Sequence, residues 1–131
     1  MSAPPPIDQC VTFIYTHDLA ATTKWYEDVL GLDCVLVQTC CKIYRTGAAG
    51  FLGICSRPNR TVEPRGVVFT MVTSDVDGWY ARLKGKGVTL EGPPELSAEF
   101  NVYAFFAADP NGYKLEFQEF RDPAWPKGSK A

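Results

Sequence analysis

The two halves of the chain carry the same pattern of helix signals, and this repeat constrains the fold more than any other feature. In the first half, Asp18 is suited to cap a helix N-terminus, and Gly31, 13 residues later, is suited to end the helix. In the second half, Asp75 and Gly87 stand 12 residues apart in the same two roles. Apolar residues recur at helical spacing between each Asp and Gly, so each half is predicted to contain one amphipathic helix.

Segments rich in β-branched and aromatic residues surround both predicted helices. One strand is predicted before each helix, and three extended segments follow it. The predicted extended segments are 11–15, 33–39, 41–45 and 51–56 in the first half and 67–72, 88–90, 103–107 and 113–117 in the second. We therefore predict one α+β domain of two tandem βαβββ modules, at about 8–56 and 66–120, with a linker at 57–65 and a tail at 121–131.

The last strand follows a turn with a clear sequence signature. Asp109, Pro110 and Gly112 occupy the first, second and fourth positions of a type I β-turn, where each of these residue types is favoured. The residues after the turn alternate in polarity, which predicts one buried and one open face. The predicted buried face carries Tyr113, Leu115 and Phe117, and the open face carries Lys114, Glu116 and Gln118.

Composition argues against several classes of function. The chain is 46% hydrophobic and 21% charged with a net charge of −2, which is typical of a globular protein and not of a nucleic-acid binder. It has no apolar run of membrane-spanning length and no signal peptide, so we expect a cytoplasmic protein that does not bind membranes. The five cysteines lack zinc-type spacing, and in a reducing compartment we expect buried or free thiols and not disulfides.

Three motifs resemble those of the vicinal oxygen chelate superfamily, which includes glyoxalase I, bleomycin-resistance proteins and extradiol dioxygenases. They are Asp18-Leu19 followed by Trp25 to Leu32, Ser74 to Asp77 followed by Leu83 and Gly87-Val88, and Asp109 to Phe117. The resemblance covers residues 11–120. It implies mixed sheets that curl around an open cleft, usually within a homodimer.

In the metal-dependent members of that superfamily, four inward-facing residues hold a divalent ion, which acts as a Lewis acid toward two vicinal oxygens of a substrate. When these positions are carried over, the first falls at Val11, the second near Gly53 or Leu52, the third near Val68 or Phe69, and the last at Glu116. Only Glu116 is a possible ligand, and one carboxylate does not make a metal site. We therefore predict no metal ligand set and no cofactor, and a divalent ion stays open as an alternative.

The same alignment predicts what lines the cleft. Apolar and aromatic side chains on one side face a small polar cluster, a composition that suits a flat or amphipathic organic molecule. The predicted ligand-binding residues are Phe13, Tyr15, Cys55, Thr70, Val72, Lys114, Glu116 and Gln118. Glu116 could face solvent, orient a ligand or act as a general base; the second role is our working hypothesis, and Glu116 is the candidate catalytic residue. The alternative is that these side chains fill the space between the sheets and leave no pocket.

We therefore expect a homodimer that binds a small organic molecule, similar to the bleomycin-resistance proteins. A first alternative is an enzyme, related to the lyases, isomerases or dioxygenases, with a non-standard site around Glu116. A second is a thiol-based sensor of a metal or metalloid at Cys40 and Cys41, since thiolates prefer soft ions. Adjacent strand residues point to opposite faces, so these two sulfurs could converge only if the chain turns there. The sequence leaves open whether any reaction is catalysed.

Overall fold

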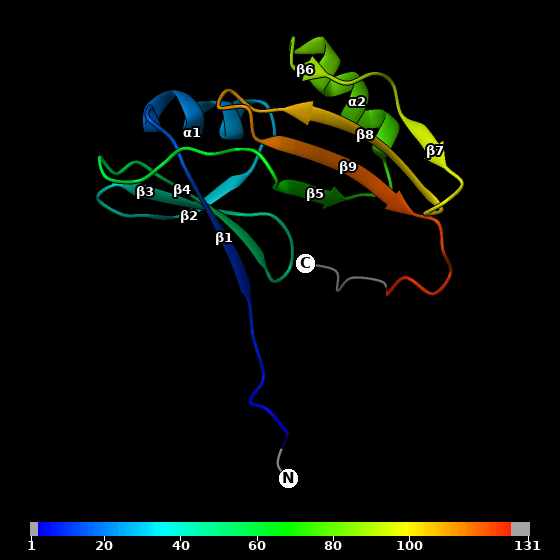
Figure 1. The fold of residues 1–131 in the computed structure, drawn as a ribbon, viewed down its shortest axis with the longest axis horizontal. Helices are drawn as coiled ribbons and strands as arrows, with labels where there is room; N and C mark the ends of the chain where they lie inside the picture. Colours follow the sequence, from blue (N-terminus) through cyan, green and yellow to red (C-terminus); the bar gives the residue numbers. More distant parts are fainter. Residues whose placement is uncertain (1–2, 127–131) are drawn as a thin grey trace.

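The computed structural model describes residues 3–126, which form two mixed β-sheets and two helices (Figure 1). The first half forms a four-stranded sheet in the order β1-β4-β3-β2, in which β1 and β4 run parallel. Its elements are β1 (Cys10–Tyr15), α1 (Leu19–Asp28), β2 (Asp33–Val37), β3 (Cys41–Arg45) and β4 (Gly50–Cys55). This half matches the predicted βαβββ unit.

The second half forms a five-stranded sheet in the order β5-β9-β8-β6, with β7 also paired to β8. Its elements are β5 (Val68–Val72), α2 (Val76–Gly85), β6 (Thr89–Leu90), β7 (Glu95–Ser97), β8 (Val102–Ala108) and β9 (Lys114–Phe120). The predicted α+β fold is therefore confirmed. Both helices lie on the same side of the molecule, and the segment before β1 extends away from the sheets (Figure 1). No helix within residues 3–126 is long and apolar enough to cross a membrane.

β7 was not predicted from the sequence. Both β6 and β7 pair with the same edge of β8, so they are two pieces of one interrupted strand. Gly92, Pro93 and Pro94 separate the two pieces. Because proline has no N–H group to donate to a neighbouring strand, the pairing with β8 stops at this point and resumes at Glu95.

The helix ends follow the predicted capping residues. The side chain of Asp18 accepts a hydrogen bond from the backbone N–H of Ala21 (3.0 Å), and that of Asp75 accepts one from Gly78 (2.9 Å). Gly31 lies just after α1 with φ at 66°, in the left-handed region that favours glycine. Local signals therefore set the positions of both helices.

One hydrophobic core joins the two halves. It forms between the helices and the sheet faces that they cover, and it includes a stack in which the Phe117 ring lies between those of Phe105 and Trp79. The buried apolar residues are Ile14, Tyr26, Val29, Leu30, Tyr44, Leu52, Ile54, Phe69, Val76, Leu83, Phe105, Ala107, Tyr113, Leu115 and Phe117. The buried face predicted for the last strand is among them.

The turn before β9 binds the first half through buried hydrogen bonds. Asp109 accepts bonds from the backbone N–H groups of Asn111 and Tyr113 (both 2.8 Å), as expected for this turn, and from the hydroxyl of Tyr26 in α1 (2.7 Å). The Tyr113 hydroxyl donates to the carbonyl of Tyr15 in β1 (3.0 Å). Burial raises the pKa of Asp109, and burial together with the nearby Asp109 carboxylate raises the pKa of Tyr26.

A second junction joins the two helices. The guanidinium of Arg82 in α2 donates from Nε to the carbonyl oxygen of Val29 at the C-terminal end of α1 (2.9 Å). The last carbonyls of a helix have no partner within the helix, and they carry partial negative charge. Arg82 therefore satisfies an acceptor of the other half and places a positive charge where the dipole of α1 favours one.

We expect Tyr26→Phe to lower the free energy of unfolding by about 1.5–3 kcal/mol, because it removes one donor from a buried carboxylate. Urea denaturation followed by circular dichroism measures this change. Tyr80→Phe is the matched control, since Tyr80 packs its ring edge-on against Phe105 and its hydroxyl has no hydrogen-bond partner among residues 3–126. Equal stability of Tyr26→Phe and the wild type would contradict the role given to this bond.

Candidate functional site

A cavity of about 380 Å³ lies on the second sheet, on the side that carries Glu116. The opposite side of this sheet packs into the core, and Phe105 belongs to both the core and the cavity lining. Its lining residues are Glu91, Pro93, Glu95, Leu96, Ser97, Phe100, Val102, Ala104, Phe105, Phe106 and Glu116. Most of its wall is apolar, and its polar groups are mainly carboxylates.

The interrupted strand forms one wall of this cavity. Pro93 lies in the break between β6 and β7, and Glu95, Leu96 and Ser97 make up β7. The floor comes from β8 and β9, where Phe106 pairs with Glu116 in the antiparallel register. Paired residues of neighbouring strands project to the same side of a sheet, so the Phe106 ring and the Glu116 carboxylate lie next to each other.

Glu116 is half-buried and held by its neighbour on β5. Thr70 pairs with Glu116 in the parallel register, and its hydroxyl donates to Oε1 of the carboxylate (2.8 Å). An ionised carboxylate can accept about four hydrogen bonds, so this contact leaves acceptor capacity for a ligand. The geometry therefore fits a group that orients a bound molecule.

The charges around the cavity are mostly negative. Lys114 forms an ion pair with Glu91 (Nζ to Oε2, 3.1 Å) and lies over the Phe106 ring (4.3 Å to its centre). This pair neutralises one of the three carboxylates that line the cavity, and Glu95 and Glu116 form no ion pair with residues 3–126. The cavity therefore favours a ligand with a hydrogen-bond donor or a positive charge.

The four positions that would hold a divalent ion do not fit one. Val11 and Val68 have no donor atoms, and a side chain at Gly53 would collide with the ring of Phe13, which lies directly over it. No group of three or more His, Cys, Asp or Glu side chains in the described part of the chain is placed to hold a metal ion. Glu116 therefore has a hydroxyl neighbour and no partner ligands.

The predicted ligand-binding residues do not surround one cavity within a single chain. Glu116 lines the large cavity, and Lys114 pairs with Glu91 in its wall. Phe13 and Tyr15 line a separate hollow of about 190 Å³ that also contains Tyr113.

The remaining predicted residues have other surroundings. Thr70 lines a hollow between β5 and the first sheet, in addition to its bond to Glu116. Val72 lines a hollow that contains Trp125, and Gln118 is buried. Cys55 forms a disulfide. Whether all of these residues bind one ligand stays a prediction.

The prediction that the five cysteines are buried or free thiols and form no disulfide is wrong for two of them, because Cys41 and Cys55 form a disulfide. They face each other across β3 and β4 with 4.1 Å between their Cα atoms, a register that no local sequence signal reveals. Cys10, Cys34 and Cys40 are free. In this oxidised form, Cys41 has no thiol to offer a soft metal ion.

Part of the cavity lining was not predicted from the sequence either. The missed residues with clear chemical character are Glu91, Glu95, Phe100 and Phe106. Gly92-Pro93-Pro94 was the available signal, since two prolines in succession predict a break in strand pairing and thus an irregular wall.

The sequence profile of the glyoxalase/bleomycin resistance protein/dioxygenase superfamily matches residues 7–117. The chain belongs to this superfamily. The match covers both modules and ends within β9, one residue after Glu116. No curated protein matches the chain.

Solved structures support the fold of this superfamily. A glyoxalase/bleomycin resistance protein/dioxygenase from Nocardioides has a TM-score of 0.75 and 20% identity, with 98% of this chain and 92% of that chain covered. Lactoylglutathione lyase from Agrobacterium tumefaciens has a TM-score of 0.73 and 20% identity, with 94% and 100% covered. TioX from Micromonospora sp. ML1 has a TM-score of 0.72 and 19% identity, with 86% and 98% covered. At these identities the likeness shows the fold alone.

The position of Phe13 over Gly53 can be tested at the ligand position carried over from this superfamily. We expect Gly53→Ala to lower the free energy of unfolding by about 1–3 kcal/mol, because its Cβ must displace the Phe13 ring. Gly47→Ala is the control, since a Cβ there meets no atom within 4 Å. Thermal or urea unfolding measures both variants. If the two substitutions have the same effect, the ring does not occupy this position.

Proposed function

We propose that this superfamily member binds a small organic molecule in the cavity beside Glu116. The observation that carries the proposal is the cavity itself, whose volume of about 380 Å³ lies in the range of ligand sites. An apolar wall with a few polar groups is the usual composition of such sites. The half-buried carboxylate of Glu116, fixed by Thr70, supplies a directed acceptor.

The ligand that fits is amphipathic. Its apolar or aromatic body packs against the Phe100 and Phe106 rings, and a cationic or donor group lies toward Glu116 and Glu95. Phe100 is 68% exposed, so a ligand would remove a large apolar surface from water. Binding of this kind needs no metal ligand set, and it agrees with the unsuitable residues at Val11, Gly53 and Val68.

The cavity can be tested with three probes of similar shape and different charge. We expect cationic 9-aminoacridine to bind more tightly than neutral acridine or anionic acridine-9-carboxylate, measured by fluorescence titration at low ionic strength. Glu116→Gln should weaken 9-aminoacridine by about tenfold and leave acridine nearly unchanged, because a hydrogen bond to a charged group contributes about 1.5–3 kcal/mol.

Glu119→Gln is the matched control for this experiment. Glu119 lies on the same strand, pairs with Arg121 and does not line the cavity. Equal binding of the three probes, or no effect of Glu116→Gln, would overturn the proposed site. Turnover of a methylglyoxal–thiol adduct that Glu116→Gln abolishes would instead establish the enzyme alternative.

We propose further that two copies of the chain associate through the open sides of their sheets. Four apolar residues on these sides, Val11, Phe13, Val68 and Val72, are between 40% and 55% exposed. A second copy is the partner of matching chemistry, because each copy carries the same apolar surfaces and covering them is favourable. Such an arrangement can bring Phe13 and Tyr15 of one copy toward the cavity of the other.

Sedimentation velocity tests the dimer. We expect a dimeric mass for the wild type and a shift toward monomer for Phe13→Glu, which places a charge on the apolar surface. Val37→Glu is the control, since Val37 is also exposed but lies on the far edge strand β2. A monomeric wild-type protein at micromolar concentration would exclude this association.

A further inference from the structure

Three of the five cysteines meet at one end of the first sheet. Cys41 begins β3, Cys55 ends β4, and the disulfide joins them. Cys40 is a free, half-exposed thiol, and its Sγ lies 3.8 Å from the Sγ of Cys41. This distance is close to contact between two sulfur atoms, so a free thiol lies directly beside a disulfide.

The backbone holds Cys40 in this place. Gln38 and Cys41 exchange two hydrogen bonds (2.8 and 3.4 Å), which makes Thr39 and Cys40 a two-residue turn between β2 and β3. The carbonyl of Cys40 accepts a bond from the backbone N–H of Ser56, the residue after Cys55 (2.9 Å). Cys40 therefore belongs to the turn and Cys41 to β3, so their side chains need not point to opposite faces as two adjacent strand residues would.

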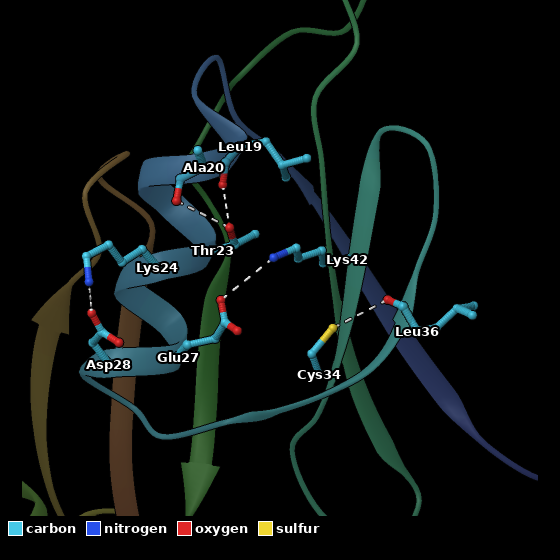
Figure 2. Close-up of polar contacts among 9 residues, drawn as sticks. All are labelled: Leu19, Ala20, Thr23, Lys24, Glu27, Asp28, Cys34, Leu36 and Lys42. Carbon is cyan, nitrogen blue, oxygen red and sulfur yellow. Dashed lines mark hydrogen bonds and ion pairs between the residues drawn. The ribbon is translucent and has the colours of Figure 1, made fainter.

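The strands that carry these cysteines are also held from outside the sheet. Lys42, next to Cys41, forms an ion pair with Glu27 of α1 (3.9 Å), and Figure 2 shows this contact between β3 and the helix. The same figure shows the free thiol of Cys34 directed to the carbonyl of Leu36 (3.6 Å), within its own strand. Cys34 is thus a free cysteine on the same sheet that does not contact Cys40, Cys41 or Cys55.

We propose that Cys40, Cys41 and Cys55 form a thiol–disulfide exchange site in which Cys40 opens the Cys41–Cys55 bond. The thiol of Cys40 loses its proton to solvent, and the thiolate attacks the Sγ of Cys41. The Cys40–Cys41 bond forms as the Cys41–Cys55 bond breaks, and the electron pair leaves on Cys55, which takes up a proton. One disulfide replaces another, so the exchange needs no oxidant or reductant.

The exchange moves the free thiol from the hairpin turn to β4. Cys55 pairs in register with Tyr15 of β1, so its side chain lies on the side of the first sheet that carries Tyr15 and Phe13, where it is buried (3% exposed). At the same time, β3 and β4 lose their covalent link. The two isomers therefore differ in which thiol is free, the half-exposed Cys40 or the buried Cys55, and in whether β3 and β4 are covalently linked.

Tryptic peptides distinguish the two isomers. Cleavage after Lys24 and Lys42 gives peptide 25–42 with Cys34, Cys40 and Cys41, and cleavage after Arg45 and Arg60 gives peptide 46–60 with Cys55. A Cys41–Cys55 bond links the two peptides. A Cys40–Cys41 bond leaves peptide 46–60 separate, with a thiol on Cys55 that iodoacetamide alkylates. Mass spectrometry therefore reads each isomer directly.

The experiment incubates full-length protein, purified without reductant, for increasing times at each pH, and then alkylates it in guanidinium chloride before digestion, because Cys55 is buried in the folded protein. We expect linked peptides and alkylated peptide 46–60 in the wild type, and more of the latter at higher pH because the thiolate is the attacking form. Cys40→Ser should abolish alkylation of Cys55 and keep the linked peptides. Cys34→Ser, the matched control, should leave the ratio of isomers unchanged.

Two results would overturn the proposal. The first is an unlabelled Cys55 in the wild type at every pH and time. The second is a Cys55 labelled equally in the wild type and in Cys40→Ser, since this would mean that it is released without Cys40. Circular dichroism and the intact Cys41–Cys55 link in Cys40→Ser check that this variant is folded.

Discussion

The hydrogen bond between Tyr26 and Asp109 is the contact on which the arrangement of the two halves depends. It joins the first helix to the last turn, 83 residues later in the chain, and both groups are buried. A buried carboxylate is stable only if donors surround it, and Asp109 has two backbone donors and this hydroxyl. The two backbone bonds therefore stabilise the turn, and the bond to Tyr26 joins the turn, and with it the second sheet, to the first half.

Features set by neighbouring residues could be predicted from the sequence. The caps Asp18 and Asp75, the turn at Asp109 and the alternation along β9 each depend on a few consecutive residues, and the structure confirms them. Family resemblance supplied the position of Glu116 on the open side of β9. Its surroundings depend on which strand lies beside it, and the sequence does not show that the neighbour is Thr70.

Features set by pairing between distant segments could not be predicted. The disulfide depends on the register of β3 and β4, which places Cys41 opposite Cys55 although neither lies in a recognisable motif. The cavity depends on where β6 and β7 leave and rejoin the edge of β8. The surroundings of Gly53 could not be predicted either. From the sequence, this glycine shows only that the expected ligand position lacks a carboxylate, whereas the structure shows that the ring of Phe13 lies over it.

The break at Pro93 and Pro94 has a second consequence, for the behaviour of the protein at high concentration. β6 and β7 form the outer edge of the second sheet, and an unbroken edge strand offers unpaired backbone groups to any other chain. Two short pieces separated by prolines are a poor template for such pairing. The prolines that interrupt this strand thus also hinder the addition of a strand from another chain. A change that made the strand continuous would remove the cavity wall and make the protein more prone to aggregate.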